Sequence, residues 1–406
     1  MKFLFAWRYF KAKKSTNAIN IISWVSVTAI VIGTASLIIL LSVFNGLEDL
    51  VKSLYSAFYA DIKISAKNGK FITLSADQLH QLNNTTVISG YSLVVEDKAL
   101  LQFQALQPVI LKGVDSNYTH ITGVSKKLVK GKFDLGTIDH PAAILGAGIE
   151  NALGIESDRS IHPISVYLFK KTGHSNDADP SESVSSSDIA ATGAFVIQQD
   201  FDNKYAITNL GFMKEMLGLQ PDEFTGVEIA LNDGVQPDAA RAALKVIFDD
   251  RYLVQTRYEQ NQSLYSVMRV EKWVIYCVLT LILIVAAFNM VGALTMLVLE
   301  KQKDIQVLKA LGADNNYIQR IFINEGMLLA LLGGGTGILL AVIICWLQVK
   351  FKLVPLQGDS FVIDHYPVKL VATDFLLVFN TIFVVALLAS WFPSRKAAME
   401  PIELRS

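Results

Sequence analysis

Four long runs of apolar residues constrain the fold of this chain more than any other feature of its sequence. They cover residues 19–44, 273–299, 326–349 and 375–392. A helix needs roughly 20 consecutive apolar residues to cross the hydrocarbon core of a bilayer, which is about 30 Å thick. None of the runs has a Lys, Arg, Asp or Glu in its middle, where a charge would be costly. The sequence therefore predicts a membrane protein with four transmembrane α-helices, one followed later by three.

The composition and the tryptophans agree with this prediction. The chain is 52% hydrophobic and only 18% charged, with a mean hydropathy of +0.38. All five Trp residues lie in or beside the runs, as membrane-interface anchors do. The first run is too long for the core of a signal peptide, and no A-x-A-like cleavage site follows it. We therefore expect residues 19–44 to remain as an uncleaved anchor.

Basic residues predict the orientation of the helices. With both termini in the cytoplasm, twelve Lys or Arg lie on the inner side, against three in the short outer loop of residues 350–374. Short cytoplasmic loops carry the excess of Lys and Arg in membrane proteins. Residues 45–272 then lie outside, with 21 Lys or Arg against 28 Asp or Glu. Residues 1–18 are expected to be a cytoplasmic amphipathic segment and residues 393–406 a cytoplasmic tail.

The outer segment combines strand-like and helix-like patterns. Alternating residues predict strands over residues 60–66 and 100–106, and helical periodicity appears over residues 210–217 and 238–248. We expect a large α+β extracytoplasmic domain over residues 45–272. It contains no Cys, so its own apolar core must hold it together.

Residues 170–192 differ from the rest of the outer segment. The stretch is rich in Ser, Asp and Gly and has almost no large apolar residue, so it cannot bury enough surface to become ordered. We predict a mobile polar loop there. Two interpretations stay open, a surface loop without a partner and a loop that binds one, since long loops often carry function.

The sequence lacks the common catalytic and nucleotide-binding motifs. It contains no G-x-x-x-x-G-K-[ST] P-loop, no H-E-x-x-H zinc motif and no G-x-S-x-G nucleophile elbow. The six His residues are scattered, and no basic patch indicates a nucleic-acid partner. We expect no enzyme activity, metal or cofactor in this chain. Ionisable residues at membrane depth are also missing from the runs, which argues against a proton-driven transporter.

Small and polar residues inside the runs predict helix packing. Gly333 and Gly337 form a G-x-x-x-G pattern, which lets a neighbouring helix approach closely. Asn289 is interpreted as an interhelical hydrogen-bonding residue rather than a substrate ligand.

The segment between the second and third runs, residues 300–325, predicts a short amphipathic helix. Apolar residues three positions apart form one stripe, acidic residues near the start match the helix dipole, and a glycine is placed to end it. The residues concerned are Glu300, Asp304, Ile305, Leu308, Leu311 and Gly312. Such a helix is either a surface helix without a partner or the point on which a soluble motor acts.

The same segment carries a family resemblance. Residues 300–313 (EKQKDIQVLKALGA) closely resemble the conserved cytoplasmic loop of the FtsX-like permease family, and the order of spans and outer domain is similar. Residues 41–46 (LSVFNG), 286–291 (AAFNMV) and 388–398 (LASWFPSRKAA) resemble the lipoprotein-releasing permeases of that family, of the LolC/LolE type. Within the outer segment, residues 144–154 (ILGAGIENALG) are the best match.

The resemblance implies a function and partners. In this family the loop is a coupling helix that docks on a separate cytosolic ABC ATPase, which would bind ATP and Mg²⁺. It also implies the bacterial inner membrane, a MacB-like periplasmic domain and a second permease copy or sister permease. A lipoprotein would be extracted from the outer leaflet and passed to a periplasmic carrier. Phe44 and Leu47 are expected to line the acyl-chain cleft, and Tyr276, Tyr366 and Pro367 to border its mouth.

Two other functions stay open from the sequence. A MacB-like exporter of peptides or small molecules would have an outer-membrane channel as partner. An FtsX-like mechanotransmission subunit, which controls a cell-wall hydrolase, would retain no acylated protein. Residues 170–192 lie about where one of the lipoprotein-releasing permeases carries a carrier-binding hook, but they lack its apolar and proline-rich character.

Overall fold

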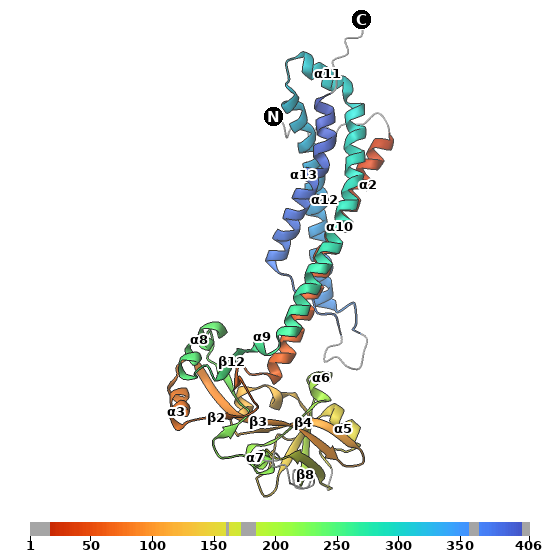
Figure 1. Ribbon diagram of the computed structural model, residues 1–406. Coiled ribbons are helices and arrows are strands. Elements are labelled where there is room, and N and C mark those ends of the chain that lie inside the picture. Colours follow the sequence, from red (N-terminus) through yellow and green to blue (C-terminus); the bar gives the residue numbers. More distant parts are fainter. Residues whose placement is uncertain (1–16, 160–161, 172–183, 357–364, 400–406) are drawn as a thin grey trace. The chain divides into compact units, whose positions relative to one another are not determined.

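The computed structural model describes residues 17–159, 162–171, 184–356 and 365–399 (Figure 1). They form two compact units. Among the described residues, the helical unit contains those up to Leu50 and from Ser266 onward, and the sheet unit contains those of Val51–Tyr265. Most of the predicted N-terminal segment and the last residues of the predicted tail lie outside the described residues.

Four long helices dominate the helical unit, and each is long and apolar enough to cross a membrane. They are α2 (Asn17–Phe58), α10 (Gln262–Glu300), α12 (Asn315–Phe351) and α13 (Ala372–Ala398). The prediction of four apolar helices, one before and three after the outer domain, is confirmed.

Each helix extends beyond the apolar run that predicted it. α2 has 42 residues, which is roughly 63 Å at 1.5 Å per residue, or about twice the hydrocarbon thickness of a bilayer. The prediction ended at Phe44 because hydropathy detects only the apolar part of a helix. The more polar residues after Phe44 continue α2 without a break. α13 likewise continues through Pro393 to Ala398. The predicted tail, residues 393–406, therefore begins as helix.

α2 and α12 approach each other closely at two glycines. A Cβ atom added to Gly333 would lie 2.9 Å from Cβ of Ile30, and one added to Gly337 would lie 2.7 Å from Cβ of Thr34. A larger residue at either position would push the helices apart. The structure thus places both glycines at a helix crossing, as the G-x-x-x-G pattern predicts.

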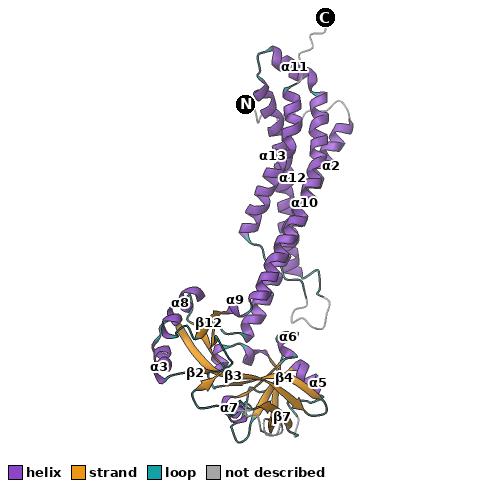
Figure 2. Cartoon of the chain, viewed as in Figure 1, coloured by secondary structure: helices purple, strands orange, loops and turns teal. Residues whose placement is uncertain are grey.

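The sheet unit contains one mixed sheet of ten strands among its described residues (Figure 2). The strands pair in the order β12-β1-β11-β3-β4-β9-β6-β8-β5, and β7 pairs with both β3 and β8. This double pairing closes β3, β4, β9, β6, β8 and β7 into a ring. The strands of the sheet are β1 (Ile62–Ala66), β3 (Ile88–Gln102), β4 (Leu106–Val114), β5 (Leu128–Gly131), β6 (Ala142–Gly146), β7 (Ile164–Phe169), β8 (Val184–Phe195), β9 (Tyr205–Asn209), β11 (Gly226–Leu231) and β12 (Tyr252–Thr256).

Short helices complete the apolar core of this unit. They are α3 (Ala76–Asn84), α4 (Tyr118–Ile121), α5 (Ala147–Leu153), α6 (Gln199–Asp202), α7 (Leu210–Leu217), α8 (Pro237–Ile247) and α9 (Arg257–Gln260), and β2 (Ile72–Thr73) pairs with β10 (Glu223–Phe224). α7 begins where the Asn209 side chain accepts from the backbone N–H of Phe212, and it buries Met213 and Leu217 against the sheet. The predicted α+β class is confirmed.

Two details of the predicted outer segment are wrong. Residues 184–192, assigned to the polar loop, belong to strand β8, which pairs with β7 on one side and β6 on the other. A polar sequence forms a strand here because neighbouring backbones pair with it while Ile189 and Ala191 point into the core. Residues 100–106 are not one strand but the end of β3, the turn over residues 103–105 and the first residue of β4. Residues 172–183 lie outside the described part of the chain.

Candidate functional site

The short helix that the sequence predicted between the second and third runs is α11 (Gln302–Ala310). It begins later than predicted, because Glu300 is the last residue of α10. Asp304 lies in its first turn. Gly312 follows the helix with φ +94°, the left-handed conformation that ends a helix. Asp314 then accepts from the backbone N–H of Tyr317 at 2.9 Å and starts α12 at once.

The predicted apolar stripe of α11 is divided between two environments. Ile305 is 1% exposed and packs in the helical core, and Leu308 is half-buried. Leu311 is 80% exposed and Val307 is 58% exposed. Because residues four positions apart share a helix face, these two form an outward apolar pair. Ile305 is thus the buried member of the predicted stripe, and Leu311, at the helix C-cap, is its exposed member. The coupling role of both residues stays a prediction.

α11 is also tied to the end of α13. The Nζ atom of Lys309 donates to the backbone carbonyl oxygen of Ala398 at 2.8 Å. No local pattern predicts this bond, since the two residues are 89 positions apart. A force on α11 would therefore reach α10 and α12 through the chain and α13 through this bond.

A polar cluster joins three helices far along the chain from α11. The Nδ2 atom of Asn45 in α2 donates to Asp374 Oδ2 in α13 at 2.6 Å, and Lys272 Nζ in α10 donates to Asn45 Oδ1 at 2.7 Å. Lys272 Nζ also lies 3.3 Å from Asp374 Oδ1. We call these three residues the polar clasp. The apolar runs do not predict the polar clasp, because Lys272 and Asp374 lie just outside them.

Next to the clasp, the segment before α13 runs across α2. The backbone N–H of Lys369 donates to the carbonyl oxygen of Ser42 at 2.9 Å. A Cβ atom on Gly46 would lie 2.2 Å from the carbonyl oxygen of Pro367, so only glycine allows this approach. Pro367 thus lies against α2 between the positions of Phe44 and Leu47, both of which are half-buried.

The other two predicted cleft residues lie elsewhere. The Tyr276 hydroxyl shares a hydrogen bond of 2.6 Å with Thr381 Oγ1, which joins α10 to α13. Tyr366 is 38% exposed, and its carbonyl oxygen accepts from Gln348 Nε2 at 3.2 Å. The structure therefore brings Pro367 against α2 beside Gly46, between Phe44 and Leu47, whereas Tyr276 forms a hydrogen bond with α13 and Tyr366 forms one with α12.

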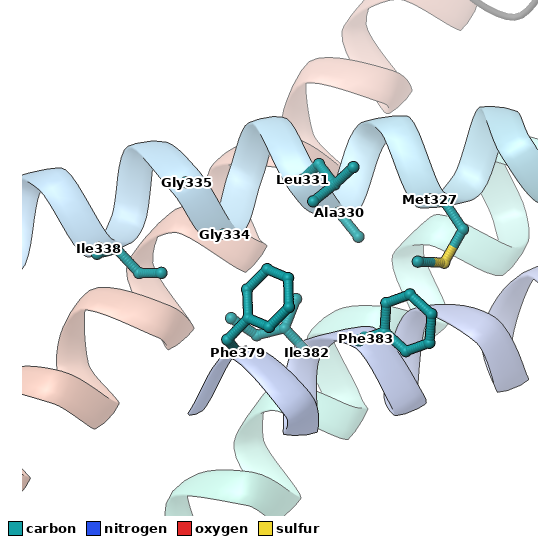
Figure 3. A pocket seen from close by; sticks show the side chains of 9 residues that line it. All are labelled: Met327, Ala330, Leu331, Gly334, Gly335, Ile338, Phe379, Ile382 and Phe383. Carbon is teal, nitrogen blue, oxygen red and sulfur yellow. The ribbon is translucent and has the colours of Figure 1, made fainter. Parts of the chain in front are cut away.

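Two apolar hollows lie between helices of the helical unit. Figure 3 shows the smaller one, of about 80 Å³, with Phe379, Ile382 and Phe383 of α13 on one side and Gly334 and Gly335 of α12 on the other. The larger one, of about 420 Å³, lies between α10 and α13. Its lining is entirely apolar or aromatic and consists of Ile284, Ala287, Phe288, Val291, Val385, Leu388, Ala389 and Phe392. Such surfaces suit hydrocarbon chains rather than charged ligands.

Asn289 follows Phe288, which lines the larger hollow. Its side chain is exposed, and no hydrogen bond to it is found among the described residues. Its interhelical hydrogen bond therefore stays a prediction. The described residues also contain no group of three or more His, Cys, Asp or Glu that could hold a metal ion.

The sequence matches two family models and several known proteins. Residues 276–402 match the FtsX-like permease C-terminal model, and residues 23–247 match the MacB-like periplasmic core domain. The lipoprotein-releasing system transmembrane protein LolC of Xylella fastidiosa is 25% identical over 98% of this chain and 96% of its own length. The corresponding protein LolE of Haemophilus influenzae is 29% identical over 100% and 99%.

Solved structures show a partial similarity. The periplasmic region of MacB from Actinobacillus actinomycetemcomitans matches with a TM-score of 0.35 and 11% identity, over 53% of this chain and 98% of that one.

Proposed function

Because the chain belongs to the family of FtsX-like permeases with a MacB-like periplasmic core domain, we propose that it is the transmembrane subunit of a lipoprotein-releasing ABC transporter. The observation that carries this proposal is the similarity to LolC and LolE proteins over practically the whole length of both chains. It favours lipoprotein release over the exporter and the hydrolase-controlling subunit.

In this proposal α11 is the coupling helix for a separate cytosolic ATPase, which binds ATP and Mg²⁺. Val307 and Leu311 present an exposed apolar pair that a soluble partner would cover. Ile305 and the Lys309–Ala398 hydrogen bond anchor the helix to the rest of the unit. This combination of an anchored face and a free face is what force transfer requires. Both chain termini are then cytoplasmic and the sheet unit is periplasmic.

The cargo is a lipoprotein whose acyl chains enter the helical unit from the outer leaflet of the inner membrane. Phe44 and Leu47, in the second half of α2, form the entry together with Pro367. A second permease, identical or a sister, completes the cleft, and Asn289 finds its hydrogen-bond partner there. The released lipoprotein passes to a soluble periplasmic carrier.

Co-purification tests this proposal. The tagged chain is extracted from its native membrane in mild detergent, and its bound proteins are identified by mass spectrometry. We expect a cytosolic ABC ATPase and acylated lipoproteins in the same complex. An ATPase with no lipoprotein would contradict the cargo assignment, and no ATPase would contradict the role of α11.

A further inference from the structure

The last turns of α2 form an aromatic cluster within the sheet unit. Phe58, the final residue of α2, is 1% exposed and stacks on Phe201 with 4.5 Å between ring centroids. Its ring also lies 4.5 Å from that of Tyr205. Tyr55, one turn earlier, meets Phe201 edge-on at 5.1 Å. The end of a helix that continues into the helical unit is thus embedded in the sheet unit by rings.

A buried ammonium group lies against this cluster. Lys112 Nζ in β4 is 5.0 Å from the ring centroid of Phe58 and 4.9 Å from that of Tyr118. It is 2.6 Å from Glu228 Oε1 in β11, and both side chains are 2% exposed. Burial alone would lower the pKa of Lys112, but the carboxylate of Glu228 raises this pKa above its usual value. The group is therefore charged at neutral pH.

Such a pair is a poor device for stability alone. Taking two charges out of water costs so much that an apolar pair of similar volume is often as stable or more stable. The Glu228 Oε2 atom, moreover, has no hydrogen-bond partner among the described residues. The pair does, however, hold the Lys112 ammonium group over the Phe58 ring, because an ammonium group binds the face of an aromatic ring. It fixes the Phe58 ring, and with it the last turn of α2, relative to β4 and β11.

We propose that Lys112 is a positioning residue that joins α2 rigidly to the sheet, so that displacement of α2 during ATP turnover moves the sheet instead of rotating the helix end. This inference rests on the proposed function. It assigns to Lys112, Glu228 and Phe58 the transfer of motion to the cargo-handling domain. None of the three needs to touch the cargo.

The test replaces the pair as a unit. Lys112→Met alone would leave Glu228 buried without its partner, so the variant is Lys112→Met with Glu228→Leu. The matched control is Lys130→Met with Glu150→Gln, which removes an ion pair in the same unit and keeps the acceptor for Ser157. Phe58→Leu removes only the aromatic ring, whereas Phe58→Tyr keeps an aromatic ring at this position. Each variant is assembled with its ATPase, and its thermal stability, ATP hydrolysis and lipoprotein release are measured.

A readout that needs no cargo accompanies these measurements. Spin labels are placed at Lys52→Cys in α2 and Asp233→Cys after β11, with Cys277→Ser and Cys345→Ala, and their distance distribution is recorded. In the Lys112→Met, Glu228→Leu variant we expect a broader distribution, near-normal melting and ATP hydrolysis, and about tenfold less release per ATP. Phe58→Leu should share this loss, whereas Phe58→Tyr and the Lys130→Met, Glu150→Gln variant should not.

Unchanged release per ATP together with a narrow distribution would overturn the inference. So would parallel losses of melting temperature, hydrolysis and release, because these would show a merely structural role. The unmodified complex could release no lipoprotein while the spin-label distance distribution still broadened in the Lys112→Met, Glu228→Leu variant. That result would contradict the proposed cargo and support the rigid attachment of α2 to the sheet.

Discussion

At the scale of single residues, glycines decide how closely the helices of the helical unit approach. Within a helix, Gly is usually less favourable than Ala by about 0.5–1 kcal/mol. At Gly337 only glycine fits, because a Cβ atom there would lie 2.7 Å from Cβ of Thr34 and from the carbonyl oxygen of Val31. Gly335, two positions earlier, would meet nothing within 4 Å. The two positions therefore separate the effect of packing from that of helix propensity.

Gly337→Ala and Gly335→Ala should change stability in opposite directions. Overpacking at Gly337 is expected to cost about 1–3 kcal/mol, whereas Gly335→Ala should be neutral or slightly stabilising. Thermal unfolding of the detergent-solubilised chain measures both. Equal melting temperatures for the two variants would show that α2 and α12 do not pack at Gly337.

Glu96 makes the sheet unit sensitive to acid. Burial alone would raise the pKa of Glu96, but Lys63, 2.6 Å away, and Lys112 hold this pKa below its usual value. A carboxylate with a lowered pKa stabilises the fold above its unfolded pKa of about 4.3, and that contribution is lost as the pH falls through the folded pKa. Glu96→Gln lacks this contribution at every pH.

The stability difference between the unmodified chain and Glu96→Gln should therefore be largest near neutral pH and shrink below about pH 4. Melting temperatures of both proteins across this range give the answer. A difference that stays constant with pH would mean that Glu96 gains nothing from its lysine neighbours.

At the scale of elements, α11 has an anchored face and an outward face, and they should respond differently to substitution. Val307→Ser with Leu311→Ser removes the exposed apolar pair without disturbing Ile305. Central apolar contacts of an interface commonly contribute more than about 1 kcal/mol each, so we expect about tenfold less ATPase to co-purify. Lys303→Ser, an exposed polar change on the same helix, is the control. Full retention of the ATPase by the double variant would rule out docking on this face.

The polar clasp is a second element-level feature with a built-in comparison. Asp374→Asn removes the buried charge shared by Asn45 and Lys272, and should cost about 1–3 kcal/mol. The neighbouring Lys369–Asp49 pair is exposed on both sides, so Asp49→Asn should cost no more than about 1 kcal/mol. Denaturation of the two variants in detergent compares them directly. A similar cost for both would show that burial does not strengthen the clasp.

The same elements show what the sequence could and could not predict. Apolar runs predicted the four helices because burial in lipid needs continuous apolar residues. They did not predict helix ends, because α2 continues as a more polar helix to Phe58. Residues 300–312 predicted α11 and its terminal glycine from local rules of helix capping. These rules could not show which members of the stripe other helices cover, so the burial of Ile305 and the exposure of Leu311 were not predicted.

Long-range contacts escaped prediction for a different reason. The clasp joins residues that lie up to 329 positions apart, and each of them alone reads as an ordinary interface residue. Strand β8 was missed because its partners, not its own side chains, make it a strand. The buried Lys112 also looked like any lysine in an alternating strand.

At the scale of the whole molecule, two boundaries between the units lie inside helices of the described residues. The boundary at Leu50 and Val51 lies inside α2, and the boundary at Tyr265 and Ser266 lies inside α10. Continuous helices transmit displacement better than flexible linkers do. In the proposed function, ATP hydrolysis by the partner moves α2 and α10, and these helices pass the movement to the sheet unit.

A measurement of lipoprotein release driven by ATP shows whether the chain is the permease of a lipoprotein-releasing ABC transporter. The chain, its co-purifying ATPase and permease, and a labelled triacylated lipoprotein are reconstituted into proteoliposomes, and the soluble carrier is added outside. If the chain is a lipoprotein-releasing permease coupled through α11, lipoprotein leaves the membrane only with hydrolysable ATP and with α11 intact. Hydrolysis of ATP without release of lipoprotein, with the carrier present, would contradict it.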